Sequence, residues 1–230
     1  MVLVATSKRN PRRSDALSRD RIVEAAIEIL DTEGESDLTF RALTTRLSTG
    51  AGAIYHHVAS KNELLAAATD EVIGRVLAEI AGDTQPRRAI RTISLGIFDA
   101  IDAHPWVGVQ LSHDPQPAVL RIWKAIGEQL RGLGVTGSAR SDAGSALVSY
   151  VLGSAAQFAA GARTRRTDAE REAYLKALAA QWTQHDPDPF VDEMATQLRE
   201  HDDREQFLAG VEIFLTGITT QTSRLVPRPP

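Results

Sequence analysis

Apolar residues recur at helical spacing through the first eighty positions of the sequence, and this period constrains the fold more than any other feature. Ile22, Ala26 and Ile29 lie at i, i+4 and i+7, on one stripe of a helix with 3.6 residues per turn. Ser18 precedes them as a favourable N-cap, and Gly34 follows where a helix commonly ends. The pattern predicts one amphipathic helix between these two residues.

Two short helices are predicted next, separated by three small residues. The first begins behind Thr39 as N-cap, with apolar residues at i, i+3 and i+7: Phe40, Leu43 and Leu47. Residues 48–50 interrupt the period, a brief helix over 51–57 follows, and the capping box of 60–63 opens a longer helix to about residue 80. This order is typical of a helix-turn-helix, whose second helix can enter a DNA major groove. Its expected small core is Phe40, Leu43, Leu47 and Ile54.

Beyond residue 85 the predicted elements are again helices, because no stretch alternates apolar and polar residues as a half-buried strand does. Pro and Gly separate seven predicted helices: 86–103, 105–111, 116–131, 139–162, 168–182, 190–199 and 204–220. The predicted fold class is all-α, with an N-terminal three-helix helix-turn-helix domain and a larger helical domain. The predicted limits are a basic disordered arm over 1–17, the helix-turn-helix domain over 18–64, the larger domain over 65–222 and a frayed tail over 223–230.

The charge of the chain is unevenly distributed. With 26 basic and 30 acidic residues, the formal net charge of −4 provides no overall positive field for nucleic acid. Residues 1–21 nevertheless hold six basic side chains against two acidic ones, which is typical either of a solvated tail or of an arm that reaches DNA. Cysteine is absent, which excludes disulfides, thiol nucleophiles and cysteine-ligated zinc. No cofactor is predicted.

Residues 38–65 resemble the DNA-binding domain of the tetracycline-repressor (TetR) family of bacterial transcriptional regulators. The likeness rests on the type and spacing of the following residues: Leu38, Thr39, Leu43, Leu47, the run from Ile54 to Val58, Lys61, Glu63, Leu64 and Leu65. A weaker likeness to the last helices of tetracycline repressors covers 190–217. The resemblance implies a repressor that a small molecule releases from a palindromic double-stranded DNA operator. The apolar run of residues 2–5 is too short for a signal-peptide core, so a cytoplasmic protein is expected. An activator, or a regulator without a small-molecule effector, remains an alternative.

The resemblance assigns one group of residues to the phosphates of DNA. Tyr55 and His57 offer O–H and N–H donors near the exposed end of the recognition helix, and Lys61 adds a positive charge in the first turn of the next helix. Thr39 either bonds a phosphate or caps its own helix. Arg41 and Arg46 are further candidates for the sugar–phosphate backbone.

A second group of residues is placed to enter the major groove: Thr49, Gly50, Ala51, Gly52, Ala53 and His56. Most of these side chains are short, and none can form a bidentate pair with guanine or adenine. The sequence therefore predicts that DNA shape and the arm, through Arg9, Arg12 or Arg13, share in the specificity.

The larger domain is the candidate for effector binding and dimerisation. In the family, helices corresponding to 139–162 and 204–220 form a four-helix dimer interface, although both could instead be intrachain core. Aromatic and polar candidates for the effector site are Trp106, Gln110, His113, Trp123, Tyr150, Gln157, Phe158 and Trp182. Tetracycline repressors place a metal-binding histidine where this sequence has Gln110, so no metal is expected.

Three segments of the sequence bear on other classes of protein. The run 132–137 matches GxGxxG, but a predicted helix precedes it where a dinucleotide site needs a strand, so an enzyme is not expected. Residues 143–162 are uncharged and as long as a membrane span, yet they are rich in Ala, Gly and Ser and are predicted to be a buried helix. A helical adaptor that binds protein through the same helices stays open, and a salt titration would distinguish it.

Overall fold

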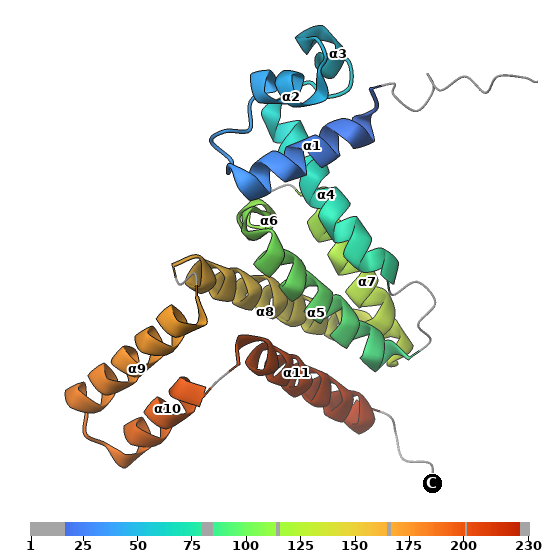
Figure 1. Cartoon of the computed structure of the whole chain (residues 1–230). Helices are drawn as coiled ribbons and strands as arrows, with labels where there is room; N and C mark the ends of the chain where they lie inside the picture. The colour runs from blue at the N-terminus through green and yellow to red at the C-terminus, as the bar shows by residue number, and fades with distance from the viewer. Residues whose placement is uncertain (1–16, 80–84, 114–115, 165–166, 201, 226–230) are drawn as a thin grey trace, which may run out of the picture. The chain divides into compact units, whose positions relative to one another are not determined.

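The computed structural model describes residues 17–79, 85–113, 116–164, 167–200 and 202–225. This part of the chain forms eleven α-helices and no strand, which confirms the all-α prediction (Figure 1). The predicted arm, except Leu17, and the last five residues of the predicted tail lie outside the described residues.

By its internal contacts the chain divides into two compact units, residues 1–68 and 69–230. The division lies within one helix, and the domain limits predicted from the sequence remain a prediction. The helices of the first unit, with the start of the helix that leads into the second, are α1 (Arg19–Thr32), α2 (Phe40–Leu47), α3 (Ala51–Tyr55) and α4 (Lys61–Glu79).

Side-chain caps begin the helices of the first unit as the sequence predicts. Ser18 Oγ accepts a hydrogen bond from the Arg21 backbone N–H at 3.2 Å. At the start of α4, Ser60 Oγ accepts from the Glu63 N–H at 3.1 Å, while the Glu63 carboxylate accepts from the Ala59 N–H at 2.9 Å. The Glu63 carboxylate therefore bonds the N–H of Ala59, the residue before the N-cap Ser60, and not the N–H of the N-cap itself. Both backbone N–H groups, which have no partner within the helix, are still satisfied.

The core of the first unit differs in part from the expected one. Leu43 and Ile54 are fully buried, but Phe40 and Leu47 are only half-buried. Four residues that the short-helix pattern left out close the core instead: Leu38, Val58, Leu64 and Leu65. Leu38 and Val58 lie outside the short helices, where helical periodicity gives no signal, so only the fold shows that they pack inward.

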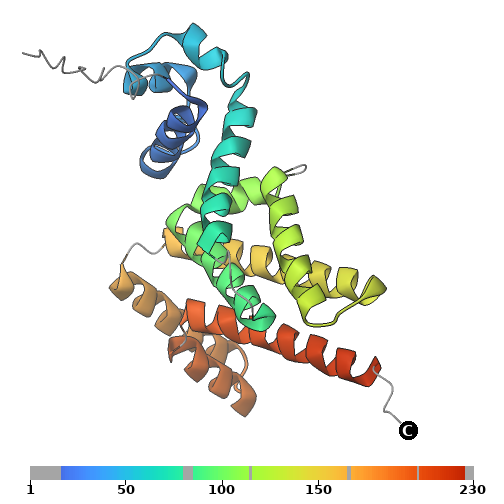
Figure 2. The ribbon, with the colours of Figure 1, turned by 90° about the vertical axis from the view of Figure 1, so that its right-hand side faces the viewer.

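The second unit is built around one long helix. Its elements after α4 are α5 (Pro86–Ala103), α6 (Pro105–Leu111), α7 (Pro117–Gly132), α8 (Gly137–Thr164), α9 (Asp168–His185), α10 (Pro189–Glu200) and α11 (Asp203–Leu225). Helix α8 packs against α5, α6, α7 and α11, while α9 and α10 lie side by side as a hairpin (Figures 1 and 2). These bounds agree with the predicted helices to within a few residues at each end.

Aromatic side chains join the long helices of the second unit. The Phe98 ring of α5 lies 5.8 Å from Phe158 of α8 and 4.8 Å from Phe207 of α11. Tyr150 of α8 also packs on Phe207, and its hydroxyl donates to the Phe207 carbonyl at 3.0 Å. Burial raises the pKa of this phenol, so the hydroxyl keeps its proton for that bond.

Ion pairs fasten α5 to α11. The Glu212 carboxylate pairs with Arg87 at 2.8 Å and also with Arg91. Hydrogen bonds from these guanidinium groups lower the pKa of Glu212 from 4.5 to about 2. The hydrogen bond with Glu212 in turn raises the pKa of Arg91. Arg204 of α11 forms a second link, a two-pronged pair with Asp99 of α5 at 2.8 and 3.0 Å.

The GxGxxG run and the uncharged segment 143–162, which suggested other classes of protein, both lie in or between helices. The GxGxxG run joins α7 to α8, so no strand precedes it within the described chain. The segment 137–161 of α8 is long and apolar enough to cross a membrane by length and composition, with 33% of its most apolar window buried. With a third of that stretch buried, α8 is not the buried helix that the sequence predicts: it packs against four neighbouring helices but leaves residues such as Ala146, Ser149 and Gly153 exposed.

Candidate nucleic-acid interface

The turn between α2 and α3 directs the second helix of the motif. Thr39 Oγ1 accepts from the Ala42 N–H at 3.1 Å, so in this structure Thr39 caps α2. Ser48 ends α2 in the left-handed region, with φ 50° and ψ 46°, a conformation that usually requires glycine. Gly50 then begins α3 in an extended conformation.

Helix α3 is short and lies with most of its surface in solvent. It ends at Tyr55, two residues before the predicted end, and two of its first residues are Ala51 and Gly52, both with short side chains. Ile54 is 0% exposed and anchors the helix, whereas Ala53 and the rest of α3 are exposed. A Cβ placed on Gly52 would meet no atom within 4 Å, so α3 is open to solvent at this position.

The aromatic residue at the end of α3 is held in place by stacking. The rings of Tyr55 and Phe40 lie 4.3 Å apart and nearly parallel, at 13°. This contact explains why Phe40 is only half-buried: it supports Tyr55 instead of filling the core. Tyr55 is 53% exposed, and the neighbouring His56 is exposed as well, while His57 is half-buried.

Lys61 has a partner within the protein. Its ammonium donates to the Glu35 carbonyl at 2.6 Å and so ties the start of α4 to the loop between α1 and α2. An ammonium has three donors, which leaves capacity for a phosphate oxygen. The sequence did not predict this structural role, because the two residues are 26 positions apart.

Of the two arginines of α2, Arg41 is exposed and Arg46 is engaged. Arg46 pairs with Glu28 at 3.0 Å and with Glu33 at 2.9 Å, so it joins α2 to α1 and its neighbouring loop. The sequence offered Arg46 as a backbone contact, and the structure gives it this structural role. As DNA contacts, all the residues assigned from the sequence remain predictions.

A charge pattern separates the helix-turn-helix from the rest of its unit. From residue 38 to residue 62 the chain contains no Asp or Glu, although the whole chain holds 30. Over 17–68, by contrast, eight acidic residues oppose five basic ones. The segment that carries α2 and α3 is therefore free of carboxylates that would repel a phosphate backbone. A count of charge by segment could have found this signal in the sequence.

Comparisons with known proteins agree on this segment and extend beyond it. The family model described as bacterial regulatory proteins, tetR family, matches residues 22–68. The solved structure of the transcriptional regulator SCO7222, a TetR from Streptomyces coelicolor, is 47% identical in sequence. It superposes with a TM-score of 0.80 over 89% of this chain and 99% of that one. The chain belongs to the TetR family.

Two curated relatives carry related descriptions. An HTH-type transcriptional regulator of Saccharopolyspora erythraea is 31% identical over 152 residues, which are 64% of this chain. The HTH-type transcriptional repressor DrrR1 of Streptomyces coeruleorubidus is 31% identical over 177 residues, or 70% of this chain. The match spans 63% of the length of each relative.

The eight effector candidates of this TetR-family chain do not form one group. Trp106 and Gln110 of α6 are buried in the second unit, whereas His113 and Gln157 are exposed. Three more are half-buried and contact neighbouring residues: Trp123 beside Gly144, Tyr150 on Phe207 and Phe158 on Phe98. Trp182 lines a hollow of the α9–α10 hairpin, and none of the other seven residues lines that hollow.

Among the described residues of the second unit, three polar side chains are buried: Thr69, Ser94 and Gln110. Ser94 Oγ has no hydrogen-bond partner among the described residues. A buried hydroxyl without a partner is costly, which points to a bound water or a ligand group at this place. The sequence did not select Ser94, because a single Ser in an apolar helix gives no signal.

Proposed function

We propose that this TetR-family protein is a cytoplasmic, ligand-responsive repressor that binds double-stranded DNA through residues 18–64. The exposed face of α3, in a segment without carboxylates, carries the proposal. The buried Ile54 side chain anchors this short helix to the core of the first unit. Ala51 and Ala53 are exposed, so they can approach base edges, including thymine methyl groups. Likeness to DrrR1, a transcriptional repressor, supports repression over activation.

In this proposal, the phosphate contacts come from the rim of α3 and the start of α4. Tyr55 presents its hydroxyl from a ring that Phe40 keeps in place, and Lys61 retains free donors beside its bond to Glu35. The described part of the unit has more acidic than basic residues. The arm, with Lys8, Arg9, Arg12 and Arg13, therefore provides the remaining attraction to DNA.

DNA binding is tested by selecting oligonucleotides from a random pool and measuring their affinity by fluorescence anisotropy. Ala53→Glu adds a carboxylate to the exposed face of α3 without touching the core, so it should abolish specific binding. Ala173→Glu, the same change at an exposed helical position of α9, should leave affinity unchanged. Equal affinity of both variants would reject α3 as the recognition helix. Binding without a steep salt dependence would favour the adaptor instead.

A homodimer is proposed through α8 and α11. The apolar residues of α11 that recur at i, i+4, i+7, i+8 and i+11 are largely engaged within the chain: Phe207, Val211, Leu215 and Ile218 are buried and Phe214 packs on Tyr150. A different face remains open, with Ala209, Gly217 and Ile213, which is 73% exposed. On α8 the exposed residues of one stripe are small, with Ala146, Ser149 and Gly153. Small side chains allow two helices to approach closely, and a dimer places two recognition helices on a palindrome.

The dimer is tested by light scattering after size-exclusion chromatography. Ile213→Glu should convert dimer to monomer, because a carboxylate would have to be buried without a partner. Leu120→Glu on α7 is the matched control, since Leu120 is 72% exposed and lies outside the proposed interface. A dimer that survives Ile213→Glu would refute this assignment.

The effector is proposed to enter the core of the second unit, near the unpartnered Ser94 hydroxyl and the buried Gln110. A ligand that fits one conformer better than another shifts the population and thereby changes the affinity for DNA. Native mass spectrometry of the purified dimer should detect a retained small molecule, and Ser94→Val should weaken its retention. A regulator without an effector would show the bare dimer mass under every condition.

A further inference from the structure

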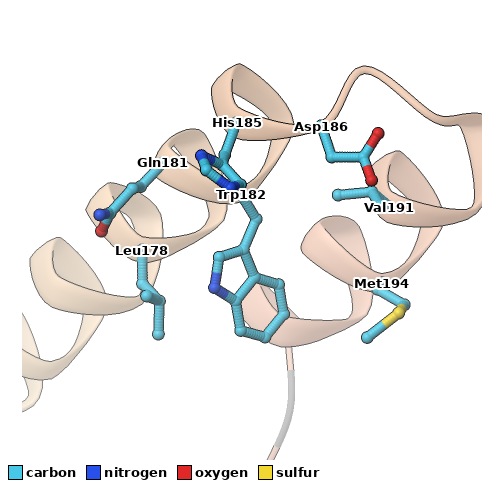
Figure 3. Close-up of a pocket in the computed structure, with 7 residues that line it drawn as sticks. All are labelled: Leu178, Gln181, Trp182, His185, Asp186, Val191 and Met194. Carbon is cyan, nitrogen blue, oxygen red and sulfur yellow. The ribbon is translucent and has the colours of Figure 1, made fainter.

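The α9–α10 hairpin contains a hollow that the proposed function does not use. Its volume is about 500 Å³, within the range of small-molecule sites. Leu178 and Trp182 of α9 and Val191 and Met194 of α10 form an apolar wall. Figure 3 shows the Leu178 and Trp182 side chains extending on the same side of α9, with Met194 across from the indole ring.

The wall offers a flat aromatic surface that is accessible to a ligand. Trp182 is half-buried and Met194 is 39% exposed, so neither side chain is sealed inside the hairpin. The same two residues also line a second hollow of about 330 Å³ toward Leu198 and Gln206. An indole face and a thioether are soft, polarisable partners that favour a planar aromatic molecule.

The carboxylate that lines the hollow belongs to an acidic stretch of the chain. Asp186, in the turn after α9, is one of the residues that line the hollow (Figure 3). Between Lys176 and Arg199 the chain has no Lys or Arg, but it has four acidic residues on the turn and the start of α10: Asp186, Asp188, Asp192 and Glu193. An anionic ligand would be repelled here, whereas a cation gains from the carboxylates and from the indole face.

We propose that the α9–α10 hairpin binds planar aromatic cations, stacked on Trp182 and balanced in charge by Asp186. The His185 imidazole, which also lines the hollow, accepts or donates a hydrogen bond at its rim. This site goes beyond the proposed function, because it is separate from the core near Ser94 and does not require DNA binding.

The proposal is tested by calorimetric titration of the full-length, DNA-free dimer with ethidium, a planar phenanthridinium cation. We expect a Kd on the order of 10 μM at low salt. The anion 8-anilinonaphthalene-1-sulfonate, an aromatic probe of opposite charge, should bind this site at least about tenfold more weakly. Raising the salt concentration should weaken ethidium binding, because the carboxylates at the rim are exposed.

Two variants locate the site. Trp182→Ala should raise the Kd for ethidium about tenfold by removing the stacking surface. Asp186→Asn, an exposed change that leaves packing intact, should raise it about two- to fivefold, and less at high salt. Matched controls on α9 outside the hollow are Tyr174→Ala and Glu172→Gln, which remove an exposed aromatic ring and an exposed carboxylate without effect on the Kd.

Several results would overturn the proposal, and none of them depends on whether the protein binds DNA. One is a dimer that fails to bind ethidium at millimolar concentration, as expected if a second copy of the chain covers the hairpin. Another is a Kd that neither Trp182→Ala nor Asp186→Asn changes, which would place the ligand elsewhere. Binding of the anionic probe as tightly as ethidium in a Trp182-dependent manner would refute the charge argument.

Discussion

Lys61→Met separates a structural role of Lys61 from its proposed contact with phosphate. Methionine keeps the length and the apolar stem of lysine but removes the charge and the bond of 2.6 Å to the Glu35 carbonyl. A hydrogen bond from a charged group contributes about 1.5–3 kcal/mol, and partial exposure places this one near the lower end. We therefore expect the free energy of unfolding to fall by about 1–1.5 kcal/mol in urea titrations.

The same substitution has a distinct effect on DNA binding if Lys61 touches phosphate. A dimer would lose two phosphate contacts, and each contact contributes about 0.9 to the slope of log K against log salt concentration. The slope should therefore decrease by about 1.8, as measured by fluorescence anisotropy between about 50 and 300 mM salt. Lys61→Arg keeps the charge and should keep the slope.

A variant of similar stability controls for indirect effects. Ser18→Ala removes the N-cap of α1, which costs about 1 kcal/mol without changing any charge. This variant should leave the salt slope unchanged. If Lys61→Met also leaves the slope unchanged, Lys61 has only the structural role, and the proposed phosphate contact is wrong.

Three further predictions concern stability. Glu212 has a pKa of about 2 in the folded chain against an ordinary 4.5, so its ion pairs stabilise the protein above about pH 4.5 and lose this effect as pH falls toward 2. Because its arginine partners are partly exposed, Glu212→Gln should lower the free energy of unfolding by about 1–2 kcal/mol at pH 7. In urea titrations, the difference in stability between wild type and variant should shrink by about pH 3. A difference that stays constant with pH would contradict the lowered pKa of Glu212. Ser48→Gly should stabilise the chain by about 0.5–1 kcal/mol in thermal melts, because it relieves the left-handed conformation, and a lower melting temperature would count against that strain. Gly210→Ala should cost about 1–3 kcal/mol, because a Cβ there would lie 1.9 Å from the Tyr150 hydroxyl oxygen; wild-type stability would show that α8 and α11 can separate.

The helices of this protein were predictable because their signals are local. Ser18 and Thr39 cap the helices that the sequence assigned to them, and the breaks at Ser48-Thr49-Gly50 and at residue 104 lie where expected. Such signals depend on neighbours within about one helical turn, so a single sequence contains them. The helix-turn-helix was therefore identifiable before any tertiary contact was known.

The candidate sites were less predictable, because their contacts join residues far apart in the chain. Arg46 was a plausible DNA contact until the fold paired it with Glu28 and Glu33 on the neighbouring helix and loop. The sequence grouped Trp182 with the other effector candidates, but in the fold it lies in the α9–α10 hairpin, apart from the other seven. Type and exposure of a side chain are not enough to assign its partner when several partners are chemically equivalent.

By itself, the sequence determined the order of helices, the caps that begin several of them and the segment free of carboxylates around α3. These properties follow from chain period, cap chemistry and residue charge, none of which requires knowledge of packing. Only the tertiary structure decided that helices of the same chain cover the apolar face of α11, and that Phe40 supports Tyr55. The physical reason is that burial is a property of contacts between helices, and an amphipathic stripe does not specify which neighbour will cover it.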